Sequence, residues 1–143
     1  MTTLRAATAA DAEALASLSD QLGYPADASA IVRRLDGIAA HDAGVVLVAV
    51  GAQGAISGFA HVQPRRLLIA EPFAELVALV VAEAARGQHV GSALLAAAEA
   101  WAREQGLVNM RVRSNVIRER AHGFYLREGY AEKKRQAVFL KQL

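Results

Sequence analysis

Residues 86–92 read Arg-Gly-Gln-His-Val-Gly-Ser and lie directly before a segment rich in leucine and alanine. If a helix begins there, its first backbone N–H groups have no intrahelical acceptor, and together with the helix dipole they attract anions. Gly87 and Gly91 remove the Cβ atom where a ligand would approach the backbone. The segment therefore indicates a phosphate-binding loop, although a strand-to-helix turn with incidental glycines explains the loop alone equally well.

Two familiar phosphate-binding motifs do not fit this loop. The Walker A motif needs a lysine followed by serine or threonine after its last glycine, whereas Ser92 and Ala93 follow Gly91. The dinucleotide-binding pattern Gly-x-Gly-x-x-Gly also fails. The sequence therefore excludes both of these nucleotide-binding classes.

The loop resembles the coenzyme A pyrophosphate loop of the GNAT superfamily of N-acetyltransferases, which has the pattern Gln/Arg-x-x-Gly-x-Gly/Ala at a helix start after the fourth strand. The pattern falls here on Arg86, Gly87, Gln88, His89, Val90 and Gly91. His89 stands where glycine is usual. The segment "AHGFYLREGY" resembles a second motif of the family, and its matching residues are Ala121, Tyr125, Gly129 and Tyr130.

The resemblance implies that acetyl-CoA is the cosubstrate. Its pyrophosphate would accept hydrogen bonds from the backbone N–H groups of residues 87–92, and the side chain of Arg86 or Ser92 would add another. Its pantetheine arm would bond to strand backbone at Leu79, Val80 and Val81. Arg118 stands where many members carry asparagine; it is expected to meet a phosphate or an anionic substrate, or else to be a solvated residue at a helix start.

Acetyl transfer also needs a proton for the departing thiolate, and in most family members a tyrosine of the fourth helix supplies it. Tyr125 matches that residue, and a phenol with a pKa near 10 can protonate a thiolate. The alternative is a tyrosine packed under the sheet.

Histone-type members of the family carry a glutamate base eleven residues before the position of Arg86, which is where Glu75 stands. Glu75 is therefore the candidate base, or else a solvated residue at a strand start. Arg113 occupies the place of the fifth-strand glutamate that members acetylating protein N-termini often use. That mechanism is disfavoured here.

The elements that would position these residues follow from the hydrophobic periodicity. Strands are expected at 3–7, 45–51, 56–63, 74–82 and 108–115, with one or two more in 130–143, and helices at 9–21, 27–40, 90–105 and 118–129. Thr8 and Asp11 are expected to cap the first helix. This order predicts an α/β fold. The resemblance implies the GNAT acyltransferase fold, a mixed, mostly antiparallel sheet of six to seven strands flanked by four helices and splayed between the fourth and fifth strands.

Composition narrows the class of protein. The chain has 143 residues, 54% of them hydrophobic, and no linker or repeat, so we expect a single domain over 1–143. It has no cysteine, which excludes thiolate metal sites and favours the cytoplasm. Its apolar runs are too short to span a bilayer, and a net charge of +2 does not indicate a nucleic-acid partner. His41, His61 and His122 lack metal-ligand spacing, so no metal is expected.

The leading hypothesis is a cytoplasmic enzyme that moves an acetyl group directly from acetyl-CoA to a primary amine, on a small molecule or on a protein lysine or N-terminus. The alternative is a non-catalytic acetyl-CoA-binding regulatory module with the same fold. Many members of the family dimerise through their last strands. A homodimer is expected from the apolar C-terminal residues Val138, Phe139, Leu140 and Leu143.

Overall fold

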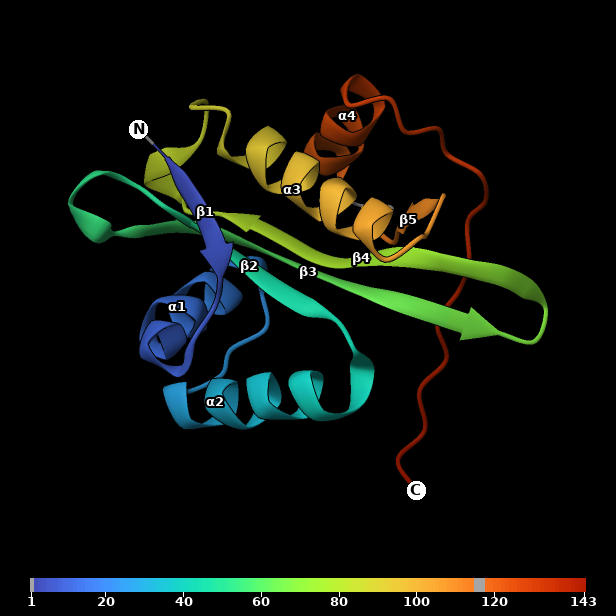
Figure 1. Ribbon diagram of the computed structural model, residues 1–143, viewed down its shortest axis with the longest axis horizontal. Coiled ribbons are helices and arrows are strands. Elements are labelled where there is room, and N and C mark those ends of the chain that lie inside the picture. Colours follow the sequence, from blue (N-terminus) through green and yellow to red (C-terminus); the bar gives the residue numbers. More distant parts are fainter. Residues whose placement is uncertain (1, 115–117) are drawn as a thin grey trace. The chain divides into compact units, whose positions relative to one another are not determined.

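The computed structural model describes residues 2–114 and 118–143. The chain forms two compact units, Met1–Arg113 and Ser114–Leu143. The first contains a sheet with the strand order β1-β2-β3-β4-β5 (Figure 1). Its strands are β1 Thr3–Ala6, β2 Val45–Val50, β3 Ile56–Leu67, β4 Ala70–Val81 and β5 Met110–Val112. Neighbouring strands are antiparallel except β4 and β5, which are parallel. The expectation of a single domain over 1–143 stays a prediction.

Helices cover both faces of this sheet (Figure 1). Two lie on one face and one on the other, namely α1 Ala12–Leu22 and α2 Ala28–Gly37, then α3 Val90–Glu104. On the first face, Leu15 and Ile31 pack with Val48 of β2, and Phe59 of β3 joins them. Gly58 points to the other face, where an added Cβ would lie 3.0 Å from Leu94 Cδ1 of α3. These contacts fix which face each strand residue occupies.

The corner between β1 and α1 is closed by the predicted cap. One 3-10 turn, Ala9–Asp11, leads into α1, and Thr8 precedes it. The buried carboxylate of Asp11 accepts hydrogen bonds from the Arg5 guanidinium at 2.8 and 2.9 Å and from the Thr8 backbone N–H at 2.8 Å. The bonds from Arg5, followed by those from Thr8, stabilise the charged form and lower the pKa of Asp11 to about 2.

A bulge divides β4 into two parts. Leu76 pairs with Val62 of β3 and Ala78 pairs with His61, so Val77 has no partner on β3. On its other edge β4 pairs with β5 only at Ala74, Glu75 and Leu76. In the described chain the remainder of β4, from Val77 onward, is paired with β3 alone. The fourth and fifth strands are thus joined over a short stretch, as the expected splay requires.

The long β3–β4 hairpin was only partly predicted. Both strands have twelve residues, because residues 64–67 and 70–73 extend the predicted strands 56–63 and 74–82 on either side of the turn. β5 is shorter than the predicted strand 108–115, whose last residue lies outside the described residues.

The prediction of one or two strands in 130–143 is wrong. The described residues there form no helix or strand, and residues 131–143 are exposed throughout. A β-strand is stable only when a neighbouring strand pairs with its backbone, and none does so in this part of the structure. The sheet therefore has five strands rather than six or seven.

The second unit contains α4, Glu119–Arg127. It agrees with the predicted helix 118–129 apart from its ends. Among the described residues, no helix of either unit combines the length and the apolar character that crossing a membrane requires.

Candidate active site

The glycine-containing loop forms the predicted entry into α3. A short 3-10 helix, Glu83–Ala85, ends β4, and α3 begins at Val90. Gly87 has a φ of 79°, a conformation that favours glycine. The loop residues Arg86, Gly87, Gln88 and His89 are exposed, whereas Gly91 and Ser92 of the first helical turn are half-buried. The N-terminus of α3 is therefore accessible to an anion.

His89 has a left-handed backbone conformation, with a φ of 62°. Its carbonyl accepts a hydrogen bond from the Ala93 N–H at 3.1 Å, so this conformation starts the helix. The left-handed conformation costs a residue with a Cβ atom roughly 1 kcal/mol or more, and glycine adopts it without this cost. The left-handed backbone conformation thus explains why glycine is usual at this position in the GNAT superfamily, which the loop resembles.

The bulge at Val77 decides which backbone groups of β4 face the open edge. The Ala74 N–H donates to the Asn109 carbonyl beside β5 at 2.9 Å, whereas the Ala82 N–H donates to the Ser57 carbonyl beside β3 at 2.7 Å. Backbone groups alternate between the two edges of a strand. Since the backbone groups of Ala82 face β3, those of Val81 and Leu79 face the opposite edge of β4.

Val80 therefore differs from its two neighbours. Its backbone groups face β3. Its carbonyl oxygen is so close to Gly58 of β3 that an added Cβ there would lie 2.6 Å from it. Of the three residues expected to hold the pantetheine arm by their backbone, Leu79 and Val81 present N–H and C=O groups to the open edge. Val80 does not.

Glu75 is on β4, four residues before Leu79, with its side chain on the face covered by α1 and α2. It is only 7% exposed. Its Oε1 lies 3.1 Å from Arg113 Nε, and its Oε2 lies 3.9 Å from Arg65 Nη1. The contact with Arg113 is an ion pair rather than an aligned hydrogen bond, because Oε1 has no hydrogen-bond partner in the described residues. Glu75 is therefore a buried carboxylate compensated by two arginines, not a solvated strand-start residue.

A third arginine shares this face. Arg111 of β5 pairs in register with Glu75, and its guanidinium carbon lies 4.0 Å from the centroid of the Phe73 ring. A guanidinium over an aromatic face is attracted to the ring electrons, and this contact does not use its N–H groups as hydrogen-bond donors to a carboxylate. We call Arg65, Arg111 and Arg113 the arginine cluster.

Arg65 and Arg111 were not among the site residues predicted from the sequence. A signal was available in the alternation of side chains, since Phe73 and Glu75 occupy one face of one strand, and Arg111 and Arg113 occupy one face of the next. What the pattern lacked was the register that puts Arg111 beside Glu75.

Tyr125 lies on α4 in the second unit. Its ring makes edge-to-face contacts with Phe124, at 5.2 Å between centroids, and with Tyr130, at 6.0 Å. Burial raises the pKa of the Tyr125 hydroxyl to about 12, because the charged phenolate is poorly solvated there. The side chain is therefore neutral at physiological pH. Arg118 is the exposed residue that precedes the same helix.

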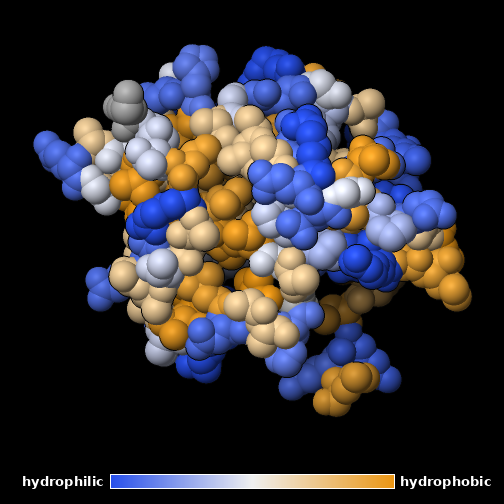
Figure 2. Space-filling view, viewed as in Figure 1, coloured by the Kyte–Doolittle hydropathy of each residue, from blue (hydrophilic) through white to orange (hydrophobic). Residues whose placement is uncertain are grey.

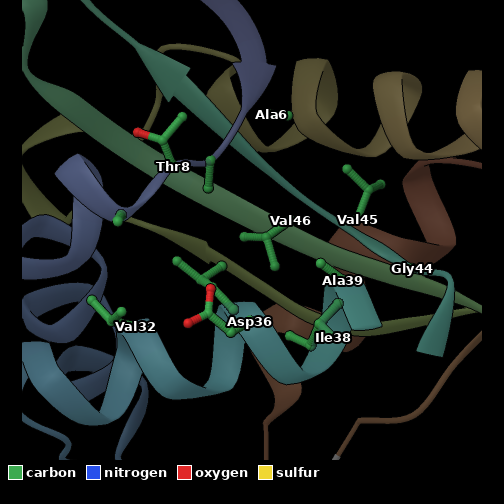
Figure 3. A pocket seen from close by; sticks show the side chains of 12 residues that line it. Ala6, Thr8, Val32, Asp36, Ile38, Ala39, Gly44, Val45 and Val46 are labelled. Atoms are coloured by element: carbon green, nitrogen blue, oxygen red, sulfur yellow. The ribbon is translucent and has the colours of Figure 1, made fainter. Parts of the chain in front are cut away.

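A separate pocket of about 260 Å³ lies between α2 and the strands β1 and β2 (Figure 3). Of the twelve residues that line it, Thr8 and Asp36 have polar side chains. The surface in this region is mostly hydrophobic in the space-filling view (Figure 2). None of the predicted site residues is among these twelve, so the pocket is distinct from the loop and from the arginine cluster.

Sequence comparison matches residues 12–130 to a family model described as the acetyltransferase (GNAT) family. An aminoglycoside N(6')-acetyltransferase type 1 of Stenotrophomonas maltophilia is 35% identical over 141 residues, which are 96% of this chain and 91% of that protein. An aminoalkylphosphonate N-acetyltransferase of Salmonella typhimurium strain LT2 is 48% identical over 58 residues, which are 41% of this chain and 38% of that protein.

Structural comparison agrees with the sequence match. A solved structure of an aminoglycoside N-acetyltransferase in complex with CoA has a TM-score of 0.86 at 20% identity, over 100% of this chain and 96% of that chain. At such low identity the likeness concerns the fold alone. It confirms the fold class that the loop and the second motif predicted.

Proposed function

Because the chain belongs to the GNAT acetyltransferase family, we propose that it transfers the acetyl group of acetyl-CoA to the primary amine of a small molecule, in the cytoplasm. The observation that carries this proposal is the open edge of β4, which is followed, after a short 3-10 helix and the glycine-containing loop, by the accessible N-terminus of α3. An extended chain with a diphosphate at one end fits such a surface, because the strand offers backbone hydrogen bonds and the helix start offers N–H groups.

The pantetheine arm of acetyl-CoA would bond to Leu79 and Val81, whose backbone groups are available at this edge. Its pyrophosphate would lie on the N–H groups of residues 87–92, with Arg86 and Ser92 nearby. A strand N–H at the end of the arm would then donate to the thioester carbonyl oxygen and stabilise the oxyanion that forms there.

In the reaction, the neutral amine attacks the thioester carbonyl carbon, and the carbon–sulfur bond breaks to release the thiolate of CoA. Tyr125 would protonate that thiolate, since its hydroxyl is neutral at physiological pH. Glu75 would take a proton from the acceptor ammonium, directly or through a water molecule. This role requires the Arg113 guanidinium to release Oε1 when the acceptor binds, because Oε1 is buried beside it.

A small-molecule acceptor is supported by the relatives, which are named for acetylation of aminoglycosides and of aminoalkylphosphonates. A protein lysine or N-terminus is the second class of acceptor. Glutamate at the position of Arg113, expected for enzymes acting on N-termini, is replaced here by a cation.

Release of free CoA thiol from acetyl-CoA tests the function, with a panel of small primary amines and a lysine-containing peptide as acceptors. Amine-dependent thiol release with a small molecule supports the proposal. If acetyl-CoA raises the melting temperature while no amine releases thiol, the protein is instead a non-catalytic acetyl-CoA-binding module. A peptide that is acetylated faster than every small amine would move the acceptor to proteins.

A further inference from the structure

The arginine cluster carries more positive charge than its surroundings neutralise. Arg65, Arg111 and Arg113 share one face of the sheet, and Glu75 is the carboxylate recorded beside them in the described residues. Three guanidinium groups and one carboxylate leave two positive charges. Like charges held close together repel unless an anion separates them, so the arrangement favours a ligand of charge −2.

The hydrogen-bonding groups of the cluster are also incompletely used. Arg113 meets Glu75 through Nε, which leaves both of its Nη groups without a recorded partner in the described residues. Arg65 lies 3.9 Å from Glu75, beyond hydrogen-bond distance. The Arg111 guanidinium is held on the Phe73 ring instead of by a carboxylate. These donors remain available to a ligand.

The cluster is accessible from solvent. The side chains of Arg65 and Arg113 are 35% and 62% exposed, whereas that of Glu75 is 9% exposed. The Glu75 carboxylate therefore lies buried beneath the cluster, and the guanidinium groups lie nearer the surface. Guanidinium forks match the oxygen atoms of a phosphate or phosphonate in geometry as well as in charge.

We propose that the acceptor is an amine that also carries a dianionic phosphate or phosphonate group, and that the arginine cluster binds this group beside Glu75. The inference rests on the proposed acetyl transfer. With the anion on the guanidinium groups, a short linker leaves the ammonium of the same molecule close to the Glu75 carboxylate. The two ends of a zwitterionic acceptor thus meet opposite charges, and a polycationic amine meets repulsion from the cluster.

The first experiment compares kcat/KM for four amines: phosphoethanolamine, 2-aminoethylphosphonate, ethanolamine and the polycation kanamycin. We expect the better of the two anionic amines to exceed ethanolamine by about 10- to 100-fold, the usual size of one or two charge-assisted hydrogen bonds. The two anionic amines distinguish a phosphate ester from a phosphonate. Equal or higher kcat/KM for ethanolamine or kanamycin would overturn the proposal.

Variants then assign the preference to the cluster. Arg111→Gln and Arg65→Gln should each reduce the ratio of kcat/KM for the anionic amine over ethanolamine by about tenfold, mainly through KM. Arg66→Gln is the matched control, because Arg66 is an exposed arginine next to Arg65 that is not part of the cluster. A ratio that is unchanged in both cluster variants, or lowered equally in the control, would contradict the assignment.

A binding measurement separates this inference from the proposed function. Ethylphosphonate has no amine and cannot be acetylated, so its effect on the melting temperature reports the cluster without the reaction. We expect stabilisation by ethylphosphonate beyond that of sodium chloride at equal ionic strength, and loss of it in Arg65→Gln. If it binds in this way but no amine is acetylated, the anion site stands and the enzymatic function fails. If amines are acetylated without any ethylphosphonate binding, the anion site fails and the function stands.

Discussion

At the scale of single residues, burial keeps the Tyr125 hydroxyl protonated and makes it a weaker acid than a free phenol. Its pKa of about 12 keeps the hydroxyl protonated at every pH at which the enzyme would work. Tyr125→Phe should lower kcat by about 10² to 10⁴ while acetyl-CoA still stabilises the fold, because a general acid contributes about that much to the rate. Tyr130→Phe, which removes a hydroxyl from the ring packed against Tyr125, is the control. A wild-type kcat in Tyr125→Phe would mean that solvent protonates the thiolate.

The same residue predicts a stability change in alkali. The unfolded tyrosine ionises near pH 10 and the folded one near pH 12. The folded state therefore keeps a proton that the unfolded state loses, and the free energy of unfolding falls as pH rises through this range, by up to about 2 to 3 kcal/mol. Denaturant titrations of wild type and Tyr125→Phe at pH 9 and pH 11 measure the difference. Parallel losses in both proteins would show that Tyr125 is not the group responsible.

Substitutions at His89 test whether its left-handed backbone conformation determines which residues are tolerated at this position of the loop. His89→Gly removes the cost of the left-handed conformation but adds chain entropy to the unfolded state, and these effects are each about 1 kcal/mol. We expect a change in unfolding free energy within about 0.5 kcal/mol and retained acetyl-CoA binding. His89→Val should destabilise by more than 1 kcal/mol, roughly, because a β-branched residue is strained there. Equal stability of the valine variant would contradict the conformation described.

At the scale of elements, Asp11 joins β1 to the start of α1. Its pKa is lowered to about 2, chiefly by the Arg5 hydrogen bonds. It therefore adds stability above the unfolded pKa near 4, and this stability is lost as pH falls from about 4 to 2. Asp11→Asn should reduce the unfolding free energy at pH 7 by about 1 to 2 kcal/mol, allowing for the partly exposed Arg5. Chemical denaturation at pH 7 and pH 2.5 measures this, with the exposed Asp20→Asn as control. A gap between Asp11→Asn and wild type that does not shrink at pH 2.5 would refute the linkage.

The contact of β3 with β4 and α3 depends on Gly58. A Cβ there would lie 2.6 Å from the Val80 carbonyl oxygen and 3.0 Å from Leu94 Cδ1. Gly58→Ala should destabilise by about 1 to 3 kcal/mol, because neither the strand nor the helix can move freely. At Gly51 the nearest atom is 3.6 Å away, so Gly51→Ala should be nearly neutral. Similar unfolding free energies for the two variants would show that β4 and α3 yield to the added methyl group.

At the scale of the whole molecule, the C-terminal segment predicts association. Val138, Phe139, Leu140 and Leu143 are each at least 90% exposed, and exposed apolar segments are typical interaction surfaces. We expect a homodimer by light scattering, with twice the chain mass of 15.2 kDa. Phe139→Asp should shift the mass toward one chain. A monomeric wild type at high micromolar concentration would contradict the prediction.

The sequence predicted most elements because their signals are local. Thr8 and Asp11 define a helix start, short apolar runs separated by turn residues identify β2 to β4, and Gly106 with a φ of 78° ends α3 as expected. The strands predicted in 130–143 are absent from the described residues because a strand needs a paired neighbour, and the residues of that segment alone do not determine whether one is present. The arginine cluster was missed for the same reason, since it requires the register of β4 with β5. The loop was found because it is continuous in the chain.

The bulge at Val77 determines how β4 would respond to a change in its length. Before it, even-numbered residues of β4 face the outer edge, and after it odd-numbered residues do. Leu76 pairs with Val62 and Ala78 pairs with the next residue of β3, His61, so deleting Val77 would leave a regular ladder with the same partners. Glu75 would keep its face, and Leu79 and Val81 would keep the outer edge. A bulge adds local twist to its strand, so the deletion would instead remove the bend at the point where β4 leaves β5.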